Sequence, residues 1–263
     1  MLLRYTMIGE QMEEFEKEEI MEGVKKHLEY VEQKYPQLKV LGIFVIGSQN
    51  YGLSLQTDEY RSNLDTVVIV QADDSFPSYM NTEMDTDNKN RIQIHAQDYF
   101  ANWLAYNTWN ITQVLFTDFK IIKDDRLNIL IRNANRLSEA NQCKMQLDIL
   151  EHVVIMCDSL SLDDSYINKR LYDTFRLYVF ARDLYYGVPY RDALHPDSID
   201  AKILIDIKTG KFSEVNDISL QKFAEEIKAS AINLLKQIEE HVDDFTIDTS
   251  AYDILDEFKK QFN

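Results

Sequence analysis

Cysteine is scarce in this sequence, which has two thiols, Cys143 and Cys157, in 263 residues. Together with Leu147, Leu150 and Val154 they follow the spacing of one apolar helical stripe. Fourteen residues along a helix span about 21 Å, which is too far for a disulfide bond. We therefore predict that both cysteines are reduced core thiols of a cytoplasmic protein.

Long apolar runs, glycine and proline are scarce as well. No window approaches the roughly 18 consecutive apolar residues of a membrane span, and the N-terminal stretch becomes acidic too soon for a signal peptide. The 7 glycines and 4 prolines form no linker, no Walker loop and no dinucleotide-binding fingerprint. We expect no membrane partner, and we expect the two halves of the chain to pack together.

Positive charge is scarce too. The sequence has 28 Lys and Arg residues and 45 Asp and Glu residues, which gives a net charge of −17. The densest basic stretch, Lys120 to Arg136, is interrupted by Asp124 and Asp125. Proteins that bind nucleic acid along its backbone normally carry a basic patch, so nucleic acid could be held only locally. The acidity also suits a solvated surface or a basic protein partner.

The apolar patterns that are present predict an α/β protein. Trp103 and Trp109 are predicted to be core side chains rather than base-stacking platforms. We predict an α/β domain over residues 1–125 and a helical domain over residues 126–263, packed against it. The expected elements are helices at 12–34, 100–107, 142–158, 167–186 and 220–242, strands at 40–46, 64–70 and 91–95, and a long loop at 71–90.

The most informative segment is IFVIGSQNYGLSLQTDEYRSNLDTVVIV, residues 43–70. A buried strand ends at Gly47 and Ser48, where a glycine lets backbone amides approach a triphosphate and a serine adds a hydroxyl group. Two carboxylates at i and i+2 on the next strand would point to the same side and share divalent metal ions. Here those two positions are Asn63 and Asp65.

This segment resembles the DNA polymerase β-type nucleotidyltransferase superfamily, whose pattern is Gly-Ser, then Asp-x-Asp, then a distant Asp. GSQNYGL and SNLDT are closest to a bacterial and phage branch of uncharacterised nucleotidyltransferases. The likeness continues through NITQVLFTDF, residues 110–119, and more weakly through KRLYDTFRL and LIDIKTGKFS. It covers about residues 40 to 215. The resemblance implies a mixed sheet flanked by helices, followed by a C-terminal helical domain.

Carried over residue by residue, the resemblance implies a damaged metal site. Asn63 and Gln93 stand at two of the three acidic positions, and Asp65 is the one predicted magnesium ligand. Gln93 in addition to Asn63 favours natural degeneration of the site over one engineered change. Tyr172 and Asp173 replace paired histidines of the branch. The residues that the resemblance assigns to nucleotide or phosphate binding are Gly47, Ser48, Tyr51, Arg61, Arg91 and Arg176.

Three functions follow from this reading. The first is a degenerate nucleotidyltransferase, a pseudoenzyme that binds a nucleotide or an RNA end, tRNA-like for example, in the old active-site cleft. The second is an active enzyme that transfers a nucleotide to RNA, protein or a small molecule. The third is a phage-type acidic inhibitor that binds a host protein complex handling nucleic acid. Loss of two carboxylates favours the first, because magnesium prefers charged oxygen ligands.

Overall fold

The computed structural model describes residues 14–54, 62–72, 76–83, 90–160, 166–241 and 249–262. The chain forms two compact units, one of Met1–Ala140 with Asp248–Asn263 and one of Asn141–Ile247. The division thus falls after Ala140, whereas the sequence analysis placed it at residue 125. The difference arises because helices α4 (Asn128–Arg132) and α5 (Ala134–Glu139) pack within the first unit.

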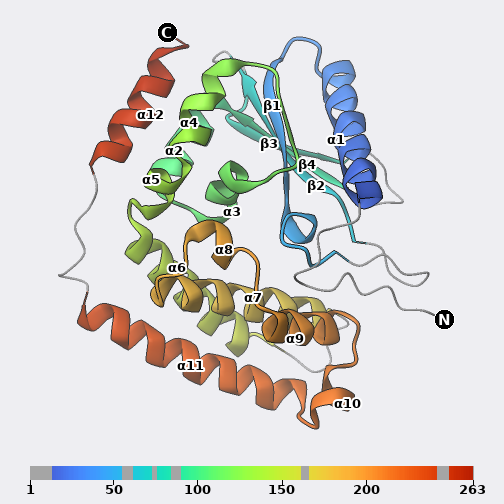
Figure 1. Cartoon of the computed structure of the whole chain (residues 1–263), viewed down its shortest axis with the longest axis vertical. Helices are drawn as coiled ribbons and strands as arrows, with labels where there is room; N and C mark the ends of the chain where they lie inside the picture. Colours follow the sequence, from blue (N-terminus) through green and yellow to red (C-terminus); the bar gives the residue numbers. More distant parts are fainter. Residues whose placement is uncertain are drawn as a thin grey trace. The chain divides into compact units, whose positions relative to one another are not determined.

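A five-stranded mixed sheet forms the centre of the first unit (Figure 1). Its strands are β1 (Lys39–Ile46), β2 (Asp65–Gln71), β3 (Tyr79–Glu83), β4 (Arg91–Ala96) and β5 (Lys120–Ile122), in the order β3-β4-β2-β1-β5. Strands β2 and β4 are parallel, and the other pairs are antiparallel. The predicted α/β fold class, a mixed sheet flanked by helices with a helical C-terminal region, is confirmed.

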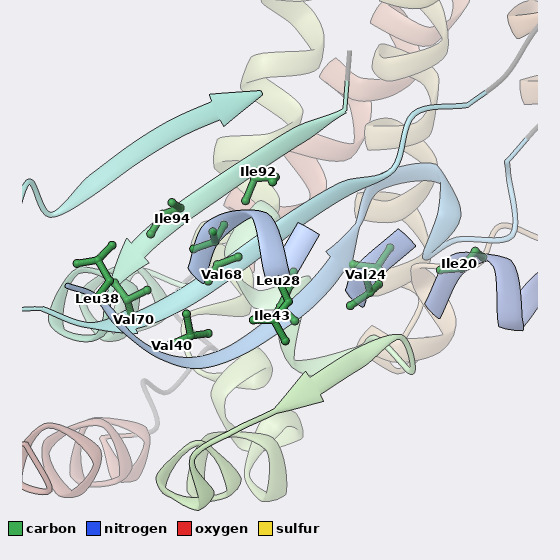
Figure 2. Close-up of a cluster of buried hydrophobic side chains, with 12 residues drawn as sticks. Ile20, Val24, Leu28, Leu38, Val40, Ile43, Val68, Val70, Ile92 and Ile94 are labelled. Atoms are coloured by element: carbon green, nitrogen blue, oxygen red, sulfur yellow. The ribbon is translucent and has the colours of Figure 1, made fainter. Parts of the chain in front are cut away.

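Helix α1 (Glu14–Lys34) covers one face of this sheet. Its buried side chains, among them Val24 and Leu28, pack against side chains that alternate along the strands, such as Val68 and Ile92 (Figure 2). The intervening positions, for example Phe44, are also buried, so both sheet faces are covered. Strands buried on both faces explain the nearly continuous apolar runs of β1 and β2.

Helix α2 (Gln97–Ala105), the short α3 (Trp109–Thr112) and the C-terminal α12 (Ser250–Lys260) complete the first unit. Arg126 fixes the C-terminal segment, because its guanidinium donates to the Gln261 carbonyl oxygen at 2.9 Å and lies 4.0 Å from the centroid of the Phe262 ring. The same guanidinium pairs with Asp124 at 2.7 Å. A segment distant in sequence thus belongs to the same compact body as the sheet.

The prediction of one long loop over residues 71–90 was wrong, because β3 lies within it. Strand β3 is an edge strand with mixed polarity, YMNTE, and the alternation is too weak to identify in sequence. The three-residue β5 was not predicted either. Helix α12 was missed although Ala251, Ile254, Leu255 and Phe258 follow helical spacing and are buried.

The second unit is helical over its described residues: α6 (Gln142–Asp158), α7 (Ile167–Tyr185), α8 (Tyr190–Ala193), α9 (Ser198–Lys208), α10 (Phe212–Asn216) and α11 (Leu220–Glu240). Gly187 follows the C-cap of α7 with φ +80°, the left-handed conformation that commonly ends a helix. Cys143 is buried and Cys157 half-buried, and burial raises the pKa of the Cys157 thiol to about 11. No helix in the described ranges combines the length and apolarity that crossing a bilayer requires.

Candidate nucleotide-binding site

The turn after β1 is the centre of the candidate site. Gly47 to Gln49 form one 3₁₀ turn, and Gly47 has φ +77°, a conformation that side chains other than hydrogen disfavour. The Gly47 carbonyl oxygen accepts from the Asn50 N–H at 2.9 Å, and the Ser48 carbonyl oxygen accepts from the Leu53 N–H at 3.0 Å. The chain therefore reverses tightly at the end of a buried strand, with Gly47 and Ser48 half-buried.

Asp65 lies directly beside this turn, because it pairs with Ile46 across β1 and β2. Its Oδ2 atom is 3.7 Å from the position that a Cβ atom on Gly47 would take. Its Oδ1 atom accepts a hydrogen bond from the Arg91 backbone N–H at 3.3 Å. The carboxylate that the sequence analysis retained as a metal ligand thus touches the predicted phosphate-binding turn.

Asn63 and Gln93, the two degenerate acidic positions, lie on the neighbouring backbone. Asn63 is exposed, and the next residue, Leu64, donates its N–H to the Asn90 side-chain oxygen at 3.1 Å. Gln93 is half-buried on β4, at the position paired with Val67 of β2. Since side chains alternate along strands, Gln93 and Asp65 project from the same sheet face.

The three arginines predicted to bind phosphate belong to different parts of the chain. The Arg91 side chain is exposed at the start of β4, next to Asp65 in the register of the two strands. Arg61 lies outside the described residues. Arg176 belongs to α7 of the second unit and is half-buried there.

Tyr51 is buried beneath the turn rather than presented on it, with 3% of its surface exposed. Its hydroxyl donates to Oε1 of the buried Gln113, and the same oxygen accepts the Gly47 N–H at 3.4 Å. The Gln113 Nε2 atom donates in turn to the Asn110 carbonyl oxygen at 3.0 Å. Tyr51 and Gln113 therefore hold the shape of the turn. No role for Gln113 was predicted from the sequence, although it lies within NITQVLFTDF, one of the stretches that carry the family resemblance.

Two residues of the turn were missed by the sequence reasoning. Gln49 and Asn50 are 5% and 7% exposed, and their Oε1 and Nδ2 atoms are buried without a hydrogen-bond partner among the described residues. Buried polar atoms in folded proteins are nearly always hydrogen-bonded, since an unpaired one costs about 1–3 kcal/mol. An unpaired acceptor and an unpaired donor on adjacent residues indicate a place where a polar ligand can complete the bonding.

The site does not fit the two-metal arrangement of nucleotidyl transfer. Asp65 supplies one carboxylate, and the amides of Asn63 and Gln93 supply neutral oxygens. Within the described ranges no group of three or more His, Cys, Asp or Glu side chains is arranged to hold a metal ion. A divalent cation normally needs several charged oxygen ligands, and magnesium otherwise keeps its water molecules.

The second unit contains a separate cluster of charged residues around Arg176. Tyr172, Asp173 and Arg176 share one face of α7, and the Lys208 Nζ atom of α9 lies 5.2 Å from the centroid of the Tyr172 ring. Burial raises the pKa of the Asp173 carboxyl, against the opposing effect of Arg176 and of two lysines. Burial also lowers the pKa of the Lys208 amine to about 8, although Asp173 raises it.

No protein-family model and no curated protein matches this sequence. Among solved structures, the chain is similar to the crystal structure of a nucleotidyltransferase-like protein from Exiguobacterium sibiricum 255-15. The TM-score is 0.34, the sequence identity is 13%, and the match covers 82% of this chain and 75% of that one. A likeness at this level says nothing about activity, ligand or partner.

Proposed function

We propose that this chain is a catalytically degenerate nucleotidyltransferase-like protein that binds a nucleotide or an RNA end at the Gly47 turn. One observation carries the proposal: the turn holds two buried side-chain atoms, Gln49 Oε1 and Asn50 Nδ2, that lack hydrogen-bond partners in the described structure. They lie within GSQNYGL, the stretch with the most specific family resemblance.

Binding without transfer follows from the charges around the turn. Phosphate oxygens can be bound by backbone and side-chain N–H groups, which a positive-φ glycine allows to approach closely. Activation of a 3′-hydroxyl needs a metal held by several carboxylates, and here Asn63 and Gln93 replace two of them. The ligand-binding half of the ancestral site is thus kept and the metal-binding half is lost.

The first test is calorimetric titration of the purified chain with ribonucleoside triphosphates, with magnesium and with EDTA. We expect binding that changes little with magnesium and that is weakened by Gly47→Ala and by Gln49→Leu. Gly187→Ala is the matched control, because Gly187 also has positive φ, at +80°, and a Cβ there would meet nothing within 4 Å. If Gly47→Ala and Gly187→Ala weakened nucleotide binding equally, general backbone strain rather than loss of the Gly47 turn would be the cause.

The second test asks whether any transfer remains. We expect no incorporation of labelled nucleotide by the unaltered chain, and incorporation only after Asn63→Asp is combined with Gln93→Asp. RNA that copurifies in the absence of added nuclease would be extracted and sequenced to identify the acceptor. Transfer by the unaltered chain contradicts degeneracy. Absence of both nucleotide and RNA binding contradicts the whole proposal and favours a protein partner at the acidic surface.

A further inference from the structure

Five aromatic side chains form a continuous row on the first unit. This aromatic row consists of Tyr79, His95, Tyr99, Trp103 and Tyr106. The ring centroids are 4.9 Å apart from Tyr79 to His95, 5.3 Å from His95 to Tyr99, 5.7 Å from Tyr99 to Trp103 and 6.5 Å from Trp103 to Tyr106. Each ring therefore contacts the next, and the row extends over three elements.

The local secondary structure produces this alignment. Tyr79 and His95 are paired residues of β3 and β4, so their side chains emerge together from one sheet face. Tyr99, Trp103 and Tyr106 are four and then three residues apart along α2 and its C-cap, which places them on one side of the helix. The prediction that Trp103 is a core residue differs from the structure, since 37% of its surface is exposed.

The buried His95 ring of the aromatic row lies beside the candidate site. The His95 Nε2 atom lies 3.4 Å from Oε1 of Gln93, the degenerate acidic position. The His95 Nδ1 atom is buried without a hydrogen-bond partner in the described structure, in a ring that is 2% exposed. The Tyr106 end of the row is open to solvent, because that residue is 63% exposed. The row thus connects the site to the surface.

Helix α2 itself carries little charge at the open end of the aromatic row. Helix α2 carries one charged side chain, Asp98, in a protein of net charge −17. Lys259 of α12 reaches the same helix, and its Nζ atom donates to Oδ1 of Asn102 at 2.7 Å. Helix α12, which packs against α2, also carries the exposed carboxylates Asp253, Asp256 and Glu257, so an RNA at Trp103 would depend on its bases more than on its phosphates.

We propose that the exposed rings of the aromatic row, Trp103 and Tyr106, stack the unpaired bases of a single-stranded RNA whose end occupies the Gly47 turn. This inference rests on the proposed function and specifies its ligand as RNA rather than a free nucleotide. Aromatic rings bind successive bases with little sequence preference, because every base has a π-face. Stacking, with few phosphate contacts, also explains how so acidic a chain can bind a polyanion.

The test uses a Trp109→Phe background, in which Trp103 is the one remaining tryptophan. A short single-stranded oligoadenylate is titrated while Trp103 fluorescence is followed, and ATP and a blunt RNA duplex serve as comparison ligands. We expect quenching by the oligoadenylate, tighter binding than for ATP, and no quenching by the duplex. One lysine contact predicts a slope of about −0.7 for the logarithm of affinity against the logarithm of salt concentration.

Substitutions at the exposed rings separate stacking from other effects. In the otherwise unaltered chain, with affinities measured by anisotropy of labelled oligoadenylate, Trp103→Leu keeps an apolar side chain but removes the ring, and Tyr106→Ala removes the outermost ring. Each is expected to weaken oligoadenylate binding about tenfold and to leave ATP affinity unchanged. Tyr252→Ala is the matched control, since Tyr252 is an aromatic residue of the same unit, 41% exposed, and lies outside the aromatic row.

The outcomes distinguish the two proposals. If Trp103→Leu and Tyr106→Ala bind oligoadenylate like the unaltered chain, or if the duplex quenches equally, the stacking inference is overturned while ATP binding at Gly47 can stand. If both substitutions weaken oligoadenylate binding but Gly47→Ala affects neither ligand, the aromatic row stands and the proposed function fails. If no RNA binds, both the RNA ligand and the stacking inference are refuted.

Discussion

Lowering the pH from 7 to 5 is expected to destabilise the first unit by about 4 kcal/mol through two buried histidines. His27 of α1 is 0% exposed and His95 of β4 is 2% exposed. Burial lowers the pKa of each imidazole from 6.5 to about 4. The His27 Nδ1 atom pairs with the Thr66 hydroxyl at 2.9 Å, and its Nε2 atom has no partner among the described residues. A proton added to either ring would be buried without compensation.

The direction and the size of this loss of stability follow from the difference between the folded and unfolded pKa values. Because the folded pKa lies below the unfolded value, the unfolded chain takes up protons first as the pH falls below 6.5, and stability is lost until the pH passes the folded pKa. Between pH 7 and pH 5 this amounts to about 2 kcal/mol for each histidine. The contribution is fully present above pH 6.5 and is lost toward pH 4.

The measurement is urea unfolding at several pH values, followed by tryptophan fluorescence. Both tryptophans, Trp103 and Trp109, belong to the first unit, so the signal reports that unit alone. His27→Gln should reduce the loss between pH 7 and pH 5 by about 2 kcal/mol. The exposed His152 provides the control substitution, His152→Gln. If His27→Gln leaves the pH dependence unchanged, or if His152→Gln reduces it equally, burial of His27 is not its cause.

Three further predictions concern other parts of the chain. Gly42→Ala should lower the melting temperature, at a cost of about 1–3 kcal/mol, because its Cβ would lie 2.8 Å from Leu127 Cδ1; an unchanged melting temperature contradicts this. Arg126→Ala should cost about 2 kcal/mol and speed amide hydrogen exchange in α12; unchanged exchange there would show that the guanidinium does not hold the helix. Asp173→Asn should lower the pKa of Lys208 below about 8, measured as amine labelling against pH, and a higher value would contradict the pairing.

The strongly patterned elements could be predicted from the sequence. Strands β1 and β2 are apolar throughout because both faces are buried, and α11 repeats its apolar residues with helical spacing. Strand β3 is different, because Met80 and Thr82 face inward beside exposed polar neighbours at the sheet edge. Its pairing with β4 depends on a partner that comes later in the chain, which a local pattern does not contain.

Part of the candidate site could likewise be predicted from the sequence, and part of it could not. The motif located Gly47 and Asp65, and the sheet register places them in contact. The burial of Gln49, Asn50 and Tyr51 could not be predicted, because polar residues in a turn are usually solvated. Gln113, from a segment later in the chain, bonds Tyr51 and the Gly47 N–H, a tertiary contact that no local pattern contains. Tertiary contacts, rather than local preference, decide which groups lack partners.

The C-terminal helix α12 has a consequence for how the protein is made. The second unit is inserted between Ala140 and Asp248 of the first, so the sheet and α1 leave the ribosome before the whole helical unit, and α12 follows it. The surface of α2 and α4 that α12 covers therefore stays open until residues 250–260 have been made. A premature stop codon just after Glu240 would leave every described helix of the second unit encoded but would remove α12 from the first unit.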